Sequence, residues 1–283
     1  MAHSIRKLHN ADTKQIQQLL QQDPKANLYL LDLLDRQGVD YWGLHRWIGA
    51  FHKGKLVSVN ADIACVQPNH PCKLSVPFGD KEGCRLLGEY TKAQGGTERI
   101  MAERIASDAF YIGLGSPAYS IKQDQKLMYA EQSLGHPFLS LEPAKKEEFP
   151  IIFEYTALMR VEDEGYDPRV RDYNLWHKTV EVLMAQQRIW VSRLHTTNDI
   201  NFVIEVGTRC SYGAQVGSVY VPPPHRGHGI GPQGMRGIVE VLLQQSSMVT
   251  LLVHEENAPA CRCYDKAGFH NGTLFRLFEM YPT

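Results

Sequence analysis

The run Val221-Pro-Pro-Pro-His-Arg-Gly-His-Gly-Ile-Gly231 decides the fold of this chain. The β-branched and aromatic residues at 217–221, just before it, predict a short strand. Just after it, apolar residues recur at helical spacing and predict a helix over 235–245. A strand, a glycine-rich loop and a helix in this order place backbone N–H groups at a helix N-terminus, where the helix dipole favours an anion. The sequence therefore predicts a phosphate-binding loop.

Two phosphate-binding patterns overlap in this loop. Gly229-Ile-Gly-Pro-Gln-Gly234 fits the dinucleotide pattern G-x-G-x-x-G, whereas Arg226-Gly-His-Gly-Ile-Gly231 fits R-x-x-G-x-G. In the dinucleotide fold the first glycine follows the strand in a tight turn. Here seven residues, three of them proline, separate Val221 from Gly229. The spacing favours R-x-x-G-x-G over a site for NAD.

The next segment carries a second motif. The continuous apolar run at 249–253 predicts a buried parallel strand. Asn257 is a natural N-cap for a helix at 258–267, which Gly268 can end in a left-handed conformation. Asn257-Ala-Pro-Ala-Cys-Arg-Cys-Tyr-Asp-Lys-Ala-Gly-Phe269 resembles the N-x-x-A-x-x-x-Y-x-K-x-G-F signature of the GNAT N-acetyltransferase superfamily. The R-x-x-G-x-G loop upstream resembles the pyrophosphate loop of the same superfamily.

The resemblance implies an α/β fold around a mixed sheet, and the first half of the chain fits a second copy of it. There the patterns predict a strand at 4–8, helices after Asn10 and at 26–37, a hairpin at 47–63, a helix at 83–94, a strand and helix start in 98–110, and a strand at 126–130. This order resembles the opening of the transferase fold, but neither motif is present. We therefore expect two GNAT-like domains in tandem: a degenerate copy at 1–135, a linker at 136–150 and a catalytic domain at 151–283.

The second half follows the family order up to the loop. The patterns predict a strand at 151–159, a polar loop at 162–171, a helix at 172–187, a hairpin of strands at 188–194 and 201–206, and a strand at 214–221. After Phe269 only 274–280 is a clear strand, although the family normally ends with two. The N-terminal domain could supply the missing strand.

The resemblance also implies the chemistry. It points to acetyl-CoA as co-substrate and to direct attack by an amine within a ternary complex, without a covalent enzyme intermediate. Tyr264 would be the proton donor to the departing CoA sulfur. A tyrosine has an ordinary pKa of ~10, so it needs help from its surroundings to protonate a thiolate of pKa ~8.5. The alternative role of Tyr264 is that of a core aromatic residue with a hydrogen-bonded hydroxyl.

The coenzyme-binding residues follow from the two motifs. Arg226 supplies a cation for the pyrophosphate, and the glycine loop supplies neutral N–H donors. Histidine at 228 makes part of the loop charge sensitive to pH near neutrality, unless it is a solvated loop residue. By the resemblance, the strand before the loop pairs with the pantetheine amides, and Asn257 contacts CoA as well as capping its helix. The expected set is Val219, Tyr220, Val221, Arg226, Gly227, His228, Gly229, Ile230, Gly231, Asn257 and Tyr264.

The general base is not evident from the sequence. Glu205, His254 and Glu255 are candidates by position, and a chain of waters is the alternative. The twelve histidines lack H-x-x-x-H and H-E-x-x-H spacing, so we predict no metal site. Cys261 and Cys263 are two residues apart on a helix and point in different directions.

Composition narrows the class of protein. The length of 283 residues suggests two domains, and a net charge of −1 predicts neither nucleic-acid nor membrane binding. We expect a cytoplasmic protein with free thiols, because six cysteines form no disulfide framework and the sequence shows no signal peptide or spanning segment. The acceptor would be a small-molecule or peptide amine, and a homodimer is possible. The rival hypothesis is a non-catalytic acyl-CoA-binding or regulatory module.

Overall fold

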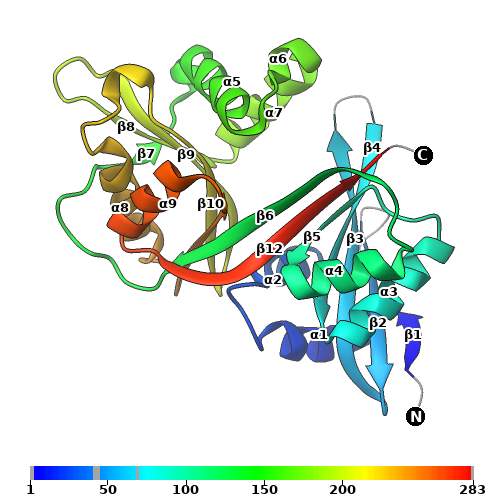
Figure 1. Cartoon of the computed structure of the whole chain (residues 1–283). Coiled ribbons are helices and arrows are strands. Elements are labelled where there is room, and N and C mark those ends of the chain that lie inside the picture. Colours follow the sequence, from blue (N-terminus) through cyan, green and yellow to red (C-terminus); the bar gives the residue numbers. More distant parts are fainter. Residues whose placement is uncertain (1–2, 41–44, 68–69, 282–283) are drawn as a thin grey trace. The chain divides into compact units, whose positions relative to one another are not determined.

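The computed structural model describes residues 3–40, 45–67 and 70–281 of the chain. These residues fold into two compact units, and each unit consists of more than one segment of the chain. Unit 1 comprises Met1–Leu127, Leu252–Glu256 and Asn271–Thr283, and unit 2 comprises Met128–Leu251 and Asn257–His270. Figure 1 traces the elements of both units along the chain.

Unit 1 consists of a mixed β-sheet and helices, and the hydrophobic core of the unit lies between the sheet and the helices. Its sheet has the strand order β1-β2-β3-β4-β5-β12-β6, in which β4 and β5 are parallel. Its elements from the first part of the chain are β1 (Ser4–Lys7), η1 (Asn10–Asp12), α1 (Thr13–Leu20), α2 (Leu28–Gln37), β2 (His45–His52), β3 (Lys55–Gln67), β4 (His70–Gly79), α3 (Lys81–Ala93), β5 (Arg99–Glu103), α4 (Arg104–Gly113) and β6 (Tyr119–Ala130).

Unit 2 repeats this order of elements. Its strands follow one another as β11-β10-β9-β8-β7, and β10 and β11 are parallel. The elements are β7 (Glu142–Pro143), η2 (Lys146–Glu148), α5 (Phe149–Glu164), α6 (Pro168–Arg171), α7 (Tyr173–Ala185), β8 (Ile189–Arg193), β9 (Ile200–Cys210), β10 (Gly213–Tyr220), η3 (Pro223–His225), α8 (Ile230–Leu242), the first half of β11 (Val249–His254) and α9 (Ala258–Lys266). The second half of β11, from Leu252, belongs to unit 1.

The two units are therefore variants of one plan, as predicted. Each has a strand, a helical segment, three antiparallel strands, a helix, a parallel strand and a further helix. The strand β4 and helix α3 of unit 1 thus correspond to β10 and α8 of unit 2. This repeat confirms the expected fold class of two mixed α/β domains in tandem.

The last strand, β12 (His270–Met280), completes the sheet of unit 1. It pairs antiparallel with β5, from Phe275 opposite Glu103 to Glu279 opposite Arg99, and it lies between β5 and β6 (Figure 1). The side chain of Arg276 is held by Asp108 at 2.8 Å and by Asp124 at 2.6 Å. The predicted boundaries placed this strand in the C-terminal domain, whereas the compact units place Asn271–Thr283 with unit 1.

The predicted strand at 151–159 is wrong, because this segment belongs to helix α5. The segment is almost continuously apolar, so its sequence shows no helical period, and its isoleucine and aromatic residues favour a strand. The buried residues nevertheless follow helical spacing, at Ile152, Phe153, Thr156, Ala157 and Met159. The helix continues to Glu164, so the predicted polar loop at 162–171 is in fact the last turn of α5, a short connection and α6.

Two further elements differ from the predictions. The sequence patterns did not predict the strand β4, because prolines at 71 and 77 interrupt the alternation typical of a strand. Helix α8 begins at Ile230, five residues before the predicted start, because Gly229 rather than a polar residue forms its N-cap. The earlier start makes Gly229 the N-cap and places Gly231 in the first turn of the helix.

Two glycines allow α3 and α4 to cross closely in unit 1. A Cβ atom at Gly113 would lie 1.9 Å from the Arg85 carbonyl oxygen, and one at Gly88 would lie 2.2 Å from the Phe110 carbonyl oxygen. Because backbone atoms cannot yield as a flexible side chain can, we expect Gly113→Ala to lower the free energy of unfolding by about 2–4 kcal/mol. Chemical denaturation measures this change. The control is Gly207→Ala, whose Cβ would meet only ordinary contacts of 3.6 and 3.7 Å; equal stability of the two variants would contradict the prediction.

Candidate functional site

The strands β10 and β11 separate at the place where the sequence predicts the site. Their parallel pairing ends with Val216 opposite Leu251. On its other side, β10 carries a bulge, because Gly217 pairs with Glu205 but Tyr220 pairs with Val203, one residue out of register. Ser218 within the bulge has a φ of 50°, which is rare for a residue with a side chain. The end of β10 therefore offers backbone groups that β11 does not use.

The glycine loop follows directly and ends in helix α8. Gly227 and Gly229 have φ values of 81° and 77°, a left-handed conformation that favours glycine. The N–H of Arg226 donates to the Pro223 carbonyl oxygen at 3.2 Å, so this backbone group is not available to an anion. The N–H groups of Ile230 and Gly231 lie in the first turn of α8, where no intrahelical acceptor is available. The loop thus has the geometry of an anion site.

A pocket of about 430 Å³ lies between this loop and helix α9. A Cβ atom at Gly231 would be 3.0 Å from the Cys263 sulfur, which shows how closely α8 approaches α9. Burial raises the pKa of the Cys263 thiol to about 11, so the thiol is neutral near pH 7. The pocket is lined by Val221, His225, Arg226, Gly227, Gly229, Ile230, Gly231, Pro232, Pro259, Arg262, Cys263 and Lys266.

The pocket brings together only part of the predicted coenzyme set. Val221 and all the predicted loop residues except His228 line it, whereas Val219, Tyr220, Asn257 and Tyr264 do not. His228 is exposed to solvent. The Asn257 side chain accepts a hydrogen bond from the Ala260 N–H at 3.1 Å, which confirms its role as N-cap of α9.

Three basic side chains of the pocket were not among the predicted residues. His225 comes from the short helix η3, and Arg262 and Lys266 come from α9. The sequence does indicate that Arg262 and Lys266 lie together, because residues four apart on a helix lie on the same face. Their position against the glycine loop depends on the packing of α9 beside α8.

Arg226 is held by a carboxylate that the sequence did not associate with it. Its Nη2 lies 2.9 Å from each carboxylate oxygen of Glu162, and its Nε donates to the Val221 carbonyl oxygen at 2.7 Å. Glu162 belongs to the last turn of α5, the segment predicted as a polar loop. The charge of the guanidinium is therefore largely compensated in this structure, and an anion in the loop would compete with Glu162 for it.

Tyr264 lies on α9 directly after Cys263, which lines the pocket. Only 9% of its surface is exposed, and its ring centroid is 6.0 Å from that of Phe269. Burial raises the pKa of its phenol, and the charge of Asp163 on α5 adds to this rise. The hydroxyl is therefore protonated at neutral pH, the state that a proton donor needs.

The candidate bases lie in different surroundings. Glu205 on β9 accepts hydrogen bonds from Arg188 at 2.9 Å and from the Ser218 hydroxyl at 3.3 Å. Both of its carboxylate oxygens are therefore engaged. His254 and Glu255 belong to unit 1, where they line a polar pocket with Asp124. The N–H of Glu255 donates to the Asp124 carbonyl oxygen at 3.1 Å.

The corresponding position in unit 1 is closed to an anion. Only Asp80 separates β4 from α3, and its carboxylate accepts a hydrogen bond from the Gly83 N–H at 2.6 Å. The chain's own carboxylate thus occupies the N-terminus of α3, and repulsion would disfavour a phosphate there. This contact gives a physical reason for regarding unit 1 as the degenerate copy.

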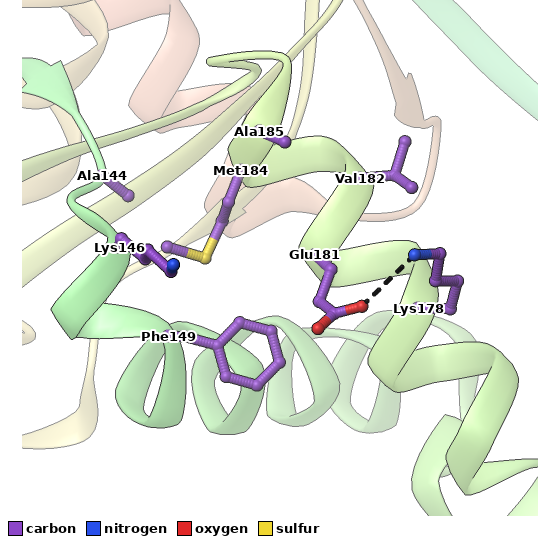
Figure 2. Close-up of a pocket in the computed structure, with 8 residues that line it drawn as sticks. All are labelled: Ala144, Lys146, Phe149, Lys178, Glu181, Val182, Met184 and Ala185. Atoms are coloured by element: carbon purple, nitrogen blue, oxygen red, sulfur yellow. Dashed lines mark ion pairs between the residues drawn. The ribbon is translucent and has the colours of Figure 1, made fainter.

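A second pocket of unit 2 has a different character. It measures about 580 Å³ and lies between the start of α5 and helix α7 (Figure 2). Phe149, Val182 and Met184 give it apolar walls, and the ammonium group of Lys178 lies 3.6 Å from the carboxylate of Glu181. Because none of its lining residues is a glycine, this pocket has no glycine loop, and we do not assign the phosphate site to it.

Three other features bear on the predictions. Among the described residues, no group of three or more histidine, cysteine, aspartate or glutamate side chains could hold a metal ion. Within the same part of the chain, every helix is too short or too polar to cross a membrane. Cys84 and Cys263 are free thiols.

Comparisons with known proteins agree with the geometry. Residues 191–269 match the model of the Acetyltransferase (GNAT) family. A GCN5-related N-acetyltransferase from Sphaerobacter thermophilus is 16% identical, with a TM-score of 0.63 over 99% of this chain and 96% of that one. A GNAT-family acetyltransferase from Colwellia psychrerythraea is 12% identical, with a TM-score of 0.55 over 98% of this chain and 100% of that one.

A tandem GNAT protein from the clavulanic acid biosynthesis pathway is also similar in structure. It is 13% identical, with a TM-score of 0.55 and full coverage of both chains. No protein of curated function matches the sequence significantly. The glycine loop and helices α8 and α9 all lie within the matched stretch. Residues 191–269 therefore belong to the GNAT acetyltransferase family, and the whole chain has the tandem fold found among its members.

Proposed function

We propose that this protein is an acetyl-CoA-dependent N-acetyltransferase whose coenzyme binds at the glycine loop of unit 2. The observation that carries the proposal is the pocket at the start of α8, because it combines free helix N–H groups with basic side chains. This pocket lies within the stretch that matches the acetyltransferase family. The acceptor would be a small-molecule or peptide amine.

The proposed reaction is direct attack of the amine on the thioester. The nitrogen of a neutral amine attacks the acetyl carbonyl carbon, a C–N bond forms and the C–S bond breaks. The thiolate of CoA then takes a proton, and the attacking nitrogen loses one to a base or to water. Tyr264 is the proposed proton donor because its phenol is buried and protonated.

The end of β10 supports the proposed position of the pantetheine arm. Because β10 and β11 stop pairing after Val216, the backbone of Val219 and Tyr220 has no partner strand on that side within the described part of the chain. An extended chain of amides can pair with such an edge as an added strand does. The arm would then lead from the glycine loop along β10 toward the bulge at Ser218.

Calorimetric titration tests the binding step. We expect acetyl-CoA to bind and NADH to give no signal. Binding of NADH in place of acetyl-CoA would support the dinucleotide pattern instead. Absence of acetyl-CoA binding would exclude both the transferase and its rival, an acyl-CoA-binding regulatory module.

Turnover separates the transferase from that rival. A panel of small amines and peptides is incubated with acetyl-CoA, and release of the free CoA thiol is followed with a thiol reagent. A transferase releases thiol in proportion to an accepted amine, whereas a binding module releases none. The engagement of both Glu205 oxygens is the observation that keeps the binding module under consideration.

The ion pair of Arg226 with Glu162 leads to a prediction on affinity. We expect Glu162→Gln to bind acetyl-CoA about threefold more tightly, because the variant frees Arg226 and an exposed ion pair is worth about 0.2–1 kcal/mol. Calorimetry at low and high salt measures the change, which should shrink at high salt. The control is Glu181→Gln, which removes a carboxylate from the other pocket of unit 2. Weaker binding by Glu162→Gln would instead mean that Glu162 holds the loop in its binding conformation.

A further inference from the structure

The cations of the pocket are not equally available to a ligand. Arg226 shares its charge with Glu162 at 2.9 Å. Arg262 and Lys266 are exposed on α9, and no carboxylate among the described residues forms an ion pair with either of them. The uncompensated positive charge of the pocket therefore lies on the α9 side, away from the arginine of the sequence motif.

The two sides of the pocket suit different anions. The glycine loop and the first turn of α8 offer neutral N–H donors, which suit the singly charged phosphates of a pyrophosphate bridge. Arg262 and Lys266 lie four residues apart on one face of α9, so both can approach one ligand group. Two cations match a terminal phosphate monoester, which carries about −1.5 to −2 charges near neutral pH.

We propose that Arg262 and Lys266 bind the 3′-phosphate of the coenzyme's ribose and thereby select CoA over its 3′-dephospho form. The proposal rests on the function proposed above, since it assigns a further group of the same ligand. The guanidinium can give two parallel hydrogen bonds to phosphate oxygens, and the ammonium adds a second charge. These residues determine specificity; they do not touch the reacting atoms.

Binding of two coenzyme forms tests the proposal. The affinity of acetyl-CoA and of 3′-dephospho-acetyl-CoA is measured by calorimetry for the wild type and for Arg262→Gln/Lys266→Gln. We expect the wild type to prefer acetyl-CoA by about tenfold, the size expected for two exposed cations on one phosphate. In the double variant the two forms should bind equally, with the affinity of the dephospho form unchanged.

The control variant is Lys178→Gln/Arg209→Gln. It removes two exposed cations of unit 2 that lie outside this pocket, so it reports the effect of net charge alone. We expect it to keep the tenfold preference. Circular dichroism and thermal unfolding check that both double variants are folded.

The other outcomes are distinguishable. If Arg262→Gln/Lys266→Gln weakened the binding of acetyl-CoA and of 3′-dephospho-acetyl-CoA equally, Arg262 and Lys266 would bind a different phosphate. This result would overturn the proposal. A preference that survives in the variant, or that is absent from the wild type, would also overturn it while leaving the transferase function intact. Failure of the wild type to bind either form would remove the proposed function itself.

Discussion

Tyr264→Phe should reduce turnover by about a hundredfold to a thousandfold and leave the affinity for acetyl-CoA within about twofold of the wild type. The substitution removes only the hydroxyl, so the ring can still pack near Phe269. The departing thiolate would then have to take its proton from water. Steady-state kinetics give the turnover, and calorimetry gives the affinity.

The pH dependence provides a second measurement on the same residue. Burial raises the pKa of the Tyr264 phenol above its ordinary value. A proton donor is active below its pKa, so loss of this proton should cause no fall in wild-type activity below about pH 10. Tyr173→Phe is the matched control, because Tyr173 is exposed on α7 and should not affect turnover. A Tyr264→Phe variant that retains full turnover would show that Tyr264 is only a core aromatic residue.

Arg226→Glu should weaken acetyl-CoA binding by about a hundredfold, because it replaces a cation by an anion beside the proposed pyrophosphate position. The new carboxylate would also lie near Glu162 and could not donate to the Val221 carbonyl oxygen, so the loop would lose two contacts. Calorimetric titration at several salt concentrations measures the effect, which should decrease as salt increases.

Arg226→Gln separates the two causes of this loss. It removes the attraction without adding repulsion, and we expect a reduction in affinity of about tenfold. Unchanged binding by Arg226→Glu would place the pyrophosphate outside the loop. An equal loss in both variants would show that the contacts of Arg226 within the loop matter more than its charge.

The parts of the site that the sequence predicted are those encoded by local patterns. Asn257 caps α9, Gly268 ends it with a φ of 92°, and the glycine loop enters α8 as expected. Each of these features depends on neighbours within a few residues. The fold class followed from the same kind of information, because the order of strands and helices is similar in the two halves.

The parts that the sequence did not predict depend on contacts between distant segments. Helix α5 was mistaken for a strand because its apolar residues show no period, and with it the contact between Glu162 and Arg226 was missed. Arg262 and Lys266 stood within a recognised motif, but their role depends on whether a carboxylate from elsewhere neutralises them. Sequence spacing contains no information on that.

The place of β12 has a consequence for the way this protein is made. A ribosome completes β5 and β6 about 140 residues before it reaches His270, yet β12 lies between these two strands. At synthesis rates of about 5–20 residues per second, both strand edges wait roughly 7–30 s for their partner. The half of the protein that emerges first is therefore completed last, and exposed strand edges of this kind are sites where chaperones or neighbouring nascent chains can bind.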